Sequence, residues 1–342
     1  MGAKMSFPDH CWYAVATLSQ VGSEPKAIRF LGQEIVLRRS AQGCIQALAG
    51  RCAHRGCSLA GGWTEQDRLV CPYHGWQYRS DGECVHIPAL RAGELIPSQA
   101  RLRVYPIHER HGLVWLWWSS DGREPTDSIA ELPELDALEL HPGGDIEFRY
   151  HTHYTRTLEN GIDPTHAAFV HGGSIGKADP DTDFSLDPYE LKFDPNTFYA
   201  RMPIKVKKVN GLMRLLLRGE TNPYKEYRYI FPNLVVSTIH FGRFSLSALQ
   251  AHVPDDNEYT SVRVTNARNF FHGIPVLSKW FDGVARSTGV KISTEDEAVI
   301  SKQRPKEVAF KGSREVLVRS DEILIAFRRM MRQHGESESP SA

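Results

Sequence analysis

The sequence has no apolar run long enough to cross a membrane as a helix. The most apolar short segment, residues 113–118, reads LVWLWW, whereas a transmembrane helix needs about 20 predominantly apolar residues. This segment has the length of a buried strand instead. The N-terminus MGAKMS also lacks the apolar core of a secretory signal. We therefore predict a chain that neither spans a membrane nor is exported.

An excess of charge of either sign is also missing. The 342 residues include 41 Lys and Arg and 41 Asp and Glu, so the formal net charge is zero. Proteins that bind nucleic acid concentrate positive charge for the phosphates, and this composition gives no such indication. We expect no nucleic-acid partner. The length allows two domains, each with its own core.

Cysteine is scarce, with six in the chain, and one stretch, from Cys52 to His74, contains two short Cys/His pairs. The pairs Cys52-Ala-His54 and Cys71-Pro-Tyr-His74 are separated by sixteen residues. Two thiolates and two imidazoles can hold either zinc or an iron–sulfur cluster. Structural zinc usually takes cysteines as one pair and histidines as another, whereas here each arm supplies one of each. Mixed arms are typical of a Rieske [2Fe–2S] cluster, in which two cysteines hold one iron and two histidines hold the other.

Glycine follows each arm, at Gly56 and Gly75, and suits tight loops whose backbone N–H groups approach the cluster sulfurs. The run from Cys52 to Trp76 resembles the Rieske family. This resemblance implies a [2Fe–2S] cluster held by the two cysteines and two histidines. A zinc ribbon, or cysteines and histidines that bind no metal, remains the alternative.

The other four cysteines are Cys11, Cys44, Cys57 and Cys84. They could form two disulfides, but nothing in their spacing requires it. Iron-bound thiolates fit a reducing compartment, so we expect a cytoplasmic protein in which these cysteines are small buried apolar side chains. Cys57 lies beside the proposed cluster loop, so it is the cysteine to test for disulfide formation.

Short alternating runs fill the first third of the chain and predict an all-β domain over residues 1–120. The expected strands are 28–31, 33–39, 45–49, 77–79, 84–87, 101–105 and 113–118. A polar segment with Gly and Pro, residues 119–125, marks the boundary.

Strand and helix patterns mix in the predicted second domain, residues 121–335. We expect a strand over 146–155 that leads into a helix at Leu158, a loop over 172–188, and further strands at 200–209, 227–240, 244–253 and 260–265. Helical spacing returns from Pro275, and one helical face carries Ile323, Ala326, Phe327, Met330 and Met331. Residues 336–342 read as a disordered tail. The predicted class is α+β, with an all-β domain followed by an antiparallel sheet with flanking helices.

A second set of metal-binding residues begins at His166 and His171. Residues five apart do not share a face of a regular helix, so both can reach one ion only if the helix is distorted or His171 lies at its end. Two histidines and one carboxylate form the typical non-haem Fe(II) site. The carboxylate could come from Glu295, Asp296 or Glu297, which the spacing alone cannot rank. The alternative is a solvated acidic helix start and a purely structural pair of histidines.

Together the two sets resemble the catalytic α subunit of the Rieske non-haem iron oxygenases along nearly the whole chain. The family motif Asn-x2-Asp-x2-His-x4-His stands here as Asn160, Asp163, His166 and His171. The resemblance implies that the two histidines and Asp296 hold a mononuclear Fe(II), in a catalytic domain of the helix-grip or START-like type. It also implies a catalytic role for Asp163 and Asn160.

In this family the aspartate at position 163 connects neighbouring subunits. The resemblance implies that it hydrogen-bonds the cluster ligand His74 of one subunit and His166 of the next. The chain's size and the pattern from Glu109 to Trp115 further resemble the homotrimeric, phthalate-type branch. That branch includes vanillate and dicamba O-demethylases, caffeine N-demethylases and saxitoxin-pathway hydroxylases, so a homotrimer is expected.

The resemblance implies a monooxygenase that uses O2 and electrons from NAD(P)H, delivered by a flavin and iron–sulfur reductase or a ferredoxin. It would hydroxylate or oxidatively demethylate a small aromatic or polycyclic substrate. His240, His252 and Asn233 lie in the expected sheet and are weak candidates for substrate contacts. Ring cis-dihydroxylation, a Rieske electron carrier without catalysis and a zinc-binding regulatory protein remain the alternatives.

Overall fold

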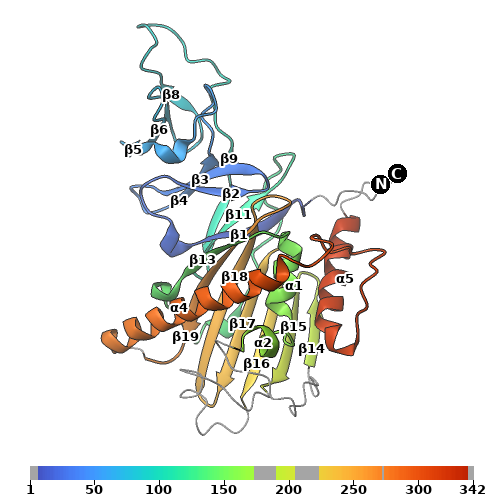
Figure 1. Ribbon diagram of the computed structural model, residues 1–342. Coiled ribbons are helices and arrows are strands. Elements are labelled where there is room, and N and C mark those ends of the chain that lie inside the picture. The colour runs from blue at the N-terminus through green and yellow to red at the C-terminus, as the bar shows by residue number, and fades with distance from the viewer. Residues whose placement is uncertain (1–6, 173–189, 205–222, 272, 338–342) are drawn as a thin grey trace. The chain divides into compact units, whose positions relative to one another are not determined.

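The computed structural model describes residues 7–172, 190–204, 223–271 and 273–337 (Figure 1). The predicted loop 172–188 lies almost wholly outside these residues, as do positions 205–209 of the predicted strand 200–209. The chain forms two compact units. The N-terminal unit comprises Asp9–Ser128 with Pro254–Asp256, and the C-terminal unit comprises Met1–Pro8, Ile129–Val253 and Asn257–Ala342. Each unit is described below by itself.

The N-terminal unit is all-β, as predicted, and is built from three antiparallel sheets. The first has the order β1-β11-β10, the second β2-β3-β4-β9 and the third β5-β6-β7-β8. The strands are β1 Cys11–Thr17, β2 Lys26–Phe30, β3 Gln33–Arg39, β4 Ile45–Ala49, β5 Trp63–Glu65, β6 Arg68–Val70, β7 Gln77–Tyr78, β8 Cys84–His86, β9 Val104–Tyr105, β10 Ile107–Arg110 and β11 Leu113–Trp118. Two 3-10 turns, η1 Leu18–Gln20 and η2 Leu59–Gly61, connect strands.

The second and third sheets together position the two Cys/His arms. One arm lies between β4 and η2, and the other between β6 and β7. Apolar side chains from the second and third sheets, including Val36, Leu48, Leu69 and Tyr78, pack into one core with the arm cysteines. The arms are therefore anchored to a core of strands, although they are loops themselves.

The C-terminal unit is organised around one eight-stranded sheet. Its order is β12-β19-β18-β17-β16-β15-β14, and β13 also pairs with β19. The strands are β12 Glu139–Leu140, β13 Ile146–Tyr150, β14 Glu190–Asp194, β15 Thr197–Pro203, β16 Tyr224–Ile230, β17 Leu234–Phe241, β18 Phe244–Pro254 and β19 Thr260–Arg268. All the pairs whose register is defined are antiparallel.

Two of the predicted strands join elements that the structure separates, and the predicted strand 101–105 is a strand only at Val104–Tyr105. The run 227–240 is two strands, β16 and β17, because Pro232 has no N–H for a ladder and the chain turns there. The run 146–155 is a strand only to Tyr150, and the helix begins at Tyr154 rather than at Leu158. In both runs most of the residue types suit a strand, so the sequence pattern alone does not show where the strand ends.

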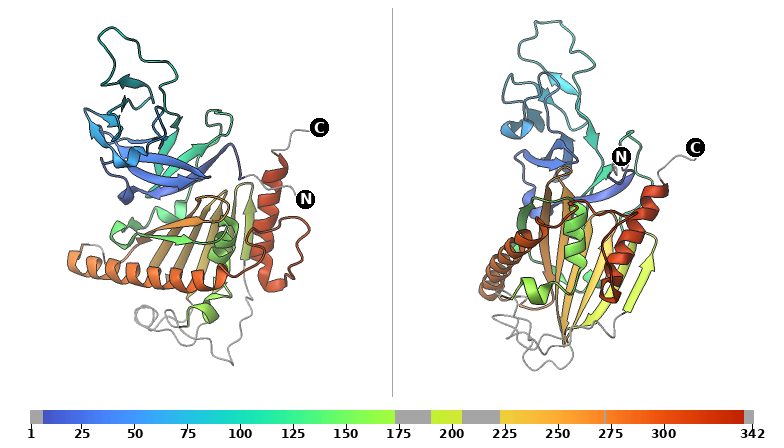
Figure 2. Two further views of the ribbon diagram at one scale, coloured as in Figure 1. Left: turned by 45° about the horizontal axis from the view of Figure 1, so that its top comes forward. Right: turned by 45° about the vertical axis from the view of Figure 1, so that its right-hand side comes forward.

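Three helices cover one face of this sheet, and we call it the helix-covered face (Figures 1 and 2). They are α1 Tyr154–Ile162, α4 Pro275–Ile300 and α5 Glu322–Ser337, and a short helix α2 Ala167–Val170 follows α1. The described ranges of this unit also contain three 3-10 turns, η3 Pro133–Leu135, η4 Pro142–Gly144 and η5 Arg319–Asp321. None of the helices in the described ranges is long and apolar enough to cross a membrane.

The core of the C-terminal unit lies between the helices and this face. Leu158 of α1 and Phe327 of α5 pack with Tyr229 and Val235 of the sheet, and Phe281 of α4 packs with its other end. The predicted apolar face of α5 is buried at all five positions. The helix runs to Ser337, so residues 336 and 337 of the predicted disordered tail are helical, and residues 338–342 lie outside the described ranges.

Candidate metal centres

The two arms of the first centre have the same backbone conformation. The N–H groups of Cys52 and Cys71 each donate to the carbonyl five residues ahead, at 2.9 Å, and the N–H groups of Gly56 and Gly75 donate back to those cysteines at 2.9 and 3.0 Å. Gly56 and Gly75 have φ of +70° and +69°, which is the left-handed region that glycine enters without a steric penalty. The repeated Cys-x-His and Cys-x2-His spacing therefore folds into two equivalent loops.

The side chains of these loops separate by type. Cys52 and Cys71 are 3% and 1% exposed, whereas His54 and His74 are exposed. The Nδ1 atoms of the two histidines lie 3.1 Å apart. Two thiols at a buried end and two imidazoles at the surface match a [2Fe–2S] cluster whose histidine-bound iron faces outward. Trp76 stacks on His54 with a ring separation of 4.6 Å and shields one side of that histidine.

Tyr78 is a partner of this centre that the sequence did not reveal. It lies on β7, is fully buried, and its hydroxyl makes a hydrogen bond with the Cys52 Sγ at 3.0 Å while accepting the N–H of Ala53 at 3.2 Å. Burial raises the pKa of both the Tyr78 hydroxyl and the Cys52 thiol. No local pattern marks this tyrosine, because it reaches the cysteine through the fold of the third sheet.

All six cysteines lie in the described ranges, and none of them, Cys57 included, forms a disulfide. Cys11 and Cys84 are buried, as predicted, but Cys57 is only partly buried and Cys44 is exposed. Cys44 lies in the turn between β3 and β4, where the side chain has no core to enter. The prediction of buried cysteines was therefore wrong for these two.

The second centre begins where α1 ends. Pro164 disfavours helical geometry in the preceding residue, and Asp163 is extended with φ −74° and ψ 120°. The chain then forms the short helix α2, with His166 immediately before it and His171 immediately after it. The interruption solves the spacing problem of the two histidines, because they flank a short helix instead of sharing one helical face.

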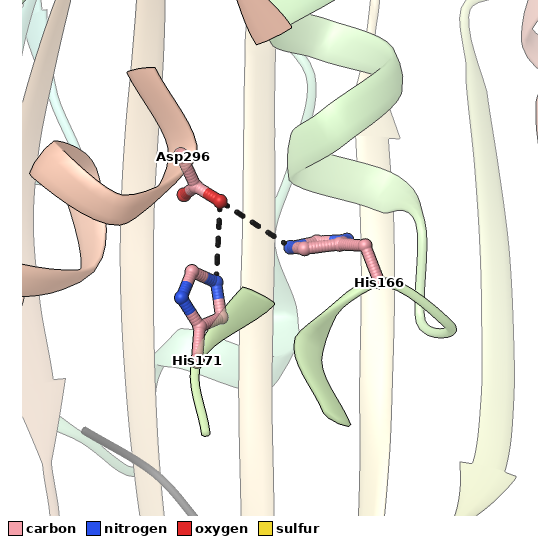
Figure 3. A group of neighbouring side chains, drawn as sticks. All are labelled: His166, His171 and Asp296. Atoms are coloured by element: carbon pink, nitrogen blue, oxygen red, sulfur yellow. Dashed lines mark ion pairs between the residues drawn. The ribbon is translucent and has the colours of Figure 1, made fainter. Parts of the chain in front are cut away.

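Asp296 of α4 meets the two histidines (Figure 3). Its Oδ1 lies 3.2 Å from the Nε2 of His171 and 3.6 Å from the Nε2 of His166. One ligand atom from each of the three residues lies within 4.8 Å of the others. Asp296 and His171 are buried and His166 is partly buried. Two imidazoles and one carboxylate that converge in this way match the donor set of a mononuclear non-haem iron site.

The acids at 295–297 do not start a helix, contrary to the alternative considered from the sequence. They lie in the last turns of the 26-residue helix α4, where the helix dipole disfavours negative charge. Two of the three have specific partners near the site. Asp296 faces both histidines, and Glu295 Oε2 lies 3.0 Å from the Nδ1 of His171.

Asp163 lies on the outer side of His166. Its Oδ2 is 3.5 Å from the His166 Nδ1, and its Oδ1 accepts hydrogen bonds from the N–H and hydroxyl of Thr165, both at 2.7 Å. Burial acts to raise the pKa of Asp163, but His166 and Thr165 lower it below the ordinary value. Asn160 lies in the last turn of α1, and its carbonyl accepts the N–H of Asp163 at 3.3 Å.

The electrostatics of His171 favour its role in a charged cluster. Burial alone would lower its pKa, but its bonds to Asp296 and Glu295 raise the pKa above the ordinary value. Both carboxylates thus favour the protonated form of this ring. A bound cation would take the place of that proton.

The structure brings one of the three predicted substrate contacts near the second centre. His252 of β18 is buried on the helix-covered face, and its Nδ1 lies 3.0 Å from the Thr157 hydroxyl of α1. Burial lowers the pKa of His252 to about 3, so the ring is neutral. Its Nε2 is buried without a hydrogen bond among the described residues, so it is a polar atom that a ligand could engage.

The side-chain amide of Asn233 supports the backbone of His252. The Asn233 Nδ2 donates to the backbone carbonyl of His252 at 3.2 Å, and the backbone carbonyl of Asn233 accepts the His252 N–H at 2.8 Å. The residue is fully buried. Asn233 therefore fixes the backbone of β18 at the histidine.

His240 is not brought to the second centre. Val235 of the same strand packs on α1, and His240, five residues further along, points to the opposite face because side chains alternate along a strand. Both ring nitrogens have partners there, Glu226 Oε2 and Ser245 Oγ, each at 2.9 Å. His240 and His252 thus lie on opposite faces of the sheet.

Comparisons with known proteins agree with this division. Residues 11–106 match the family model of the Rieske [2Fe-2S] domain, and residues 150–337 match that of the vanillate O-demethylase oxygenase C-terminal domain. The methylxanthine N1-demethylase of Pseudomonas putida is 27% identical over 349 residues, covering 96% of this chain and 89% of that protein. The phenoxybenzoate dioxygenase α subunit of Ectopseudomonas oleovorans is 33% identical over 176 residues, 48% of this chain, and the chain spans only 43% of its length.

The fold has close structural neighbours as well. The crystal structure of dicamba monooxygenase bound to dicamba superposes with a TM-score of 0.81 at 22% identity, covering 97% of this chain and 99% of that one. An all-β domain with two Cys/His arms and a sheet domain with a 2-His-1-carboxylate cluster define a protein with two iron centres of different kinds. The chain belongs to the Rieske non-haem iron oxygenases, as a catalytic α subunit. Its cofactors are a Rieske [2Fe–2S] cluster and a mononuclear non-haem iron.

Proposed function

We propose that the protein is the oxygenase component of a Rieske monooxygenase system that hydroxylates, or oxidatively removes a methyl group from, a small aromatic or polycyclic compound. It would use O2 and electrons that originate from NAD(P)H. The observation that carries this proposal is the convergence of His166, His171 and Asp296 in a chain that also contains a Rieske domain. An electron carrier has no need of a second donor set of this type.

The four residues Cys52, His54, Cys71 and His74 would hold the cluster, and His166, His171 and Asp296 the mononuclear iron. When bound, this iron would supply open coordination positions for the activation of O2 beside the substrate. The protein's own contribution is to place one carboxylate and two neutral imidazoles around a single point. The buried position of Asp296, 6% exposed, limits access of water to that point.

The exposed histidines of the first centre support an external electron donor. His54 and His74 lie at the surface, where a flavin and iron–sulfur reductase or a ferredoxin can approach them. We propose that three copies assemble in the cytoplasm, so that His74 of one subunit approaches Asp163 of the next. Support for this role comes from the position of Asp163, which touches the outer edge of His166 and keeps a side chain 22% exposed. Asn160 would help to hold the turn that presents this aspartate.

The substrate would lie over the helix-covered face, close to His252. The Thr157 hydroxyl donates to the Tyr154 carbonyl, so the His252 Nδ1–H donates to that hydroxyl. The buried, unbonded Nε2 of His252 is therefore suited to accept a hydrogen bond from a hydroxyl or N–H group of the substrate. Asn233 would act indirectly by fixing His252. By their names, the relatives act on methylxanthine, phenoxybenzoate and dicamba, which supports an aromatic or heteroaromatic compound.

Purified protein should contain three irons per chain, two in the cluster and one mononuclear. With a reductase and NADH, it should consume O2 in response to one of a panel of aromatic acids, methyl ethers, N-methyl heterocycles and sterols. Formaldehyde with a demethylated product would support demethylation. Two irons per chain and no substrate-dependent O2 use would instead show an electron carrier.

Ring cis-dihydroxylation is the second candidate. The 33% identity with a phenoxybenzoate dioxygenase subunit favours it, and the three proposed iron ligands would serve both reactions equally. The products separate the two reactions: a cis-diol that retains both oxygen atoms of O2 indicates dihydroxylation, and a phenol with formaldehyde indicates demethylation.

A further inference from the structure

We propose that Glu295 is a positioning residue for the mononuclear iron. Its carboxylate accepts a hydrogen bond from the Nδ1–H of His171 and so fixes which nitrogen of this ring faces the metal. The inference rests on the proposed function, because it takes His171 as a ligand. Glu295 directly precedes Asp296 in the chain but is not one of the three proposed metal ligands.

The ring of His171 lies between two consecutive carboxylates of α4. Its Nδ1 is 3.0 Å from Glu295 Oε2, and its Nε2 is 3.2 Å from Asp296 Oδ1. Consecutive side chains of a helix point about 100° apart. The His171 ring therefore contacts both Glu295 and Asp296 only because it lies between them, with one nitrogen towards each carboxylate. The His171 side chain is 3% exposed, and turning the ring over would place carbon atoms against both carboxylates.

The hydrogen bond selects the tautomer. An ionised carboxylate accepts hydrogen bonds but has no proton to donate. A neutral His171 beside Glu295 therefore carries its proton on Nδ1 and its lone pair on Nε2. This lone pair points to the side where Asp296 and His166 converge. Carboxylate partners of this kind orient metal-binding histidines and raise their basicity.

The other histidine lacks equivalent support. The Nδ1 of His166 is buried and makes no hydrogen bond within the described part of the chain, and Asp163 Oδ2 lies 3.5 Å away. Of the two rings, His171 is thus the one whose orientation is held by a direct bond. Loss of Glu295 should therefore affect metal binding itself.

The location of Glu295 in the helix strengthens the argument. It lies in the second-last turn of α4, so the positive end of the helix dipole does not account for a negative charge at this position. Glu297 lies in the same part of the helix, and its Oε1 accepts the backbone N–H of His151 at 3.2 Å. It therefore offers a matched control: the same residue type and charge on the same helix, with a different partner.

The test measures Fe(II) binding to protein that retains its Rieske cluster but has lost the mononuclear iron, by anaerobic competition with a coloured chelator. Glu295→Ala should weaken Fe(II) binding about 10- to 100-fold. Glu295→Gln, which keeps an acceptor oxygen without the charge, should fall between Glu295→Ala and the wild type. Glu297→Gln should stay within about twofold of the wild type. Visible absorption of the cluster and the unfolding midpoint of the iron-depleted protein should be the same in all four proteins.

Fe(II) affinity of Glu295→Ala within about twofold of the wild type would overturn the proposal. If Glu295→Ala does not fold, Glu295→Gln decides: binding as tight as in Glu297→Gln overturns the proposal, and weaker binding supports it. A wild-type protein that takes up no mononuclear iron overturns the proposed function, and the inference with it. That result is recognised before any variant is compared.

Discussion

Single side chains beyond the proposed ligands influence both centres. At the first, the Tyr78 hydroxyl lies 3.0 Å from Cys52 Sγ and would donate to it once the sulfur is a cluster-bound thiolate. Hydrogen bonds to cluster sulfurs stabilise the reduced, more negative state and raise the potential. At the second, Asp163 and Glu295 contact the outer nitrogens of His166 and His171. Tyr78 would thus adjust the reduction potential of the first centre, and Asp163 and Glu295 would orient the histidine ligands of the second.

We expect Tyr78→Phe to lower the reduction potential of the cluster. The variant loses one hydrogen bond to a thiolate, and a loss of about 1.4 kcal/mol corresponds to about 60 mV for a one-electron couple. Redox titration followed by visible spectroscopy measures this shift. Tyr73→Phe is the control, since Tyr73 is 57% exposed and the same hydroxyl is removed. Equal potentials in Tyr78→Phe and the wild type would show that the bond has no effect on the couple.

Asp163→Asn should retain both iron centres but form less product for each electron supplied. Asparagine fits the same space and is not among the proposed metal ligands, but it lacks the negative charge beside His166. A loss of about 10- to 100-fold in single-turnover product yield is expected, as for other residues that support metal ligands. Iron analysis and the cluster spectrum serve as controls. Product formation at the wild-type rate would contradict a role for Asp163 between the two centres.

Among the elements, α5 contributes to stability rather than to chemistry. Its apolar face packs on the helix-covered face of the sheet, where Phe327 contacts Tyr229 at 5.2 Å and Phe310 at 5.9 Å between ring centres. The helix thus holds the same part of the sheet that faces α1. The second centre depends on α5 only through this common core.

Phe327→Ala should reduce the free energy of unfolding by about 3–5 kcal/mol, because Phe327 is fully buried and its loss leaves a cavity. Ile325→Ala is the matched control on the same helix. Ile325 is 45% exposed, and its replacement should change stability by no more than about 0.5 kcal/mol. Urea unfolding measures both variants. Equal losses would mean that α5 is not anchored through this face.

For the molecule as a whole, buried neutral histidines predict the response to acid. Burial lowers the pKa of His153 to about 4, below its ordinary value of 6.5. The unfolded chain therefore binds a proton before the folded chain does. The contribution of His153 to stability is complete above pH 6.5 and falls by about 1.4 kcal/mol per pH unit as the pH decreases towards 4.

The test compares urea unfolding at pH 7 and pH 5. The wild type should lose about 2 kcal/mol through His153 between these values. His153→Gln should remove that part of the pH dependence, because glutamine does not titrate. An unchanged pH dependence in the variant would show that His153 is already protonated, or accessible to protons, in the folded protein.

Several features of this protein follow from the sequence alone because they depend on neighbours along the chain. Strands β3, β4 and β11 lie at the predicted residues, and so does the buried face of α5. The two Cys/His arms were also evident, since short spacing and Gly act locally, and His171 at a helix end was one of the two options that its spacing from His166 allowed. These patterns were sufficient for the fold class and for the family.

The tertiary structure decided which distant residues meet. Three adjacent acids are equivalent in sequence, and only the docking of α4 against α2 brings Asp296 to both histidines and Glu295 to the far side of His171. His252 and His240 lie on similar strands, but an odd number of positions separates His240 from the inward-facing Val235, so the two histidines occupy opposite faces. Tyr78 reaches Cys52 across 26 residues. Such contacts depend on packing over long sequence separations, which local periodicity does not encode.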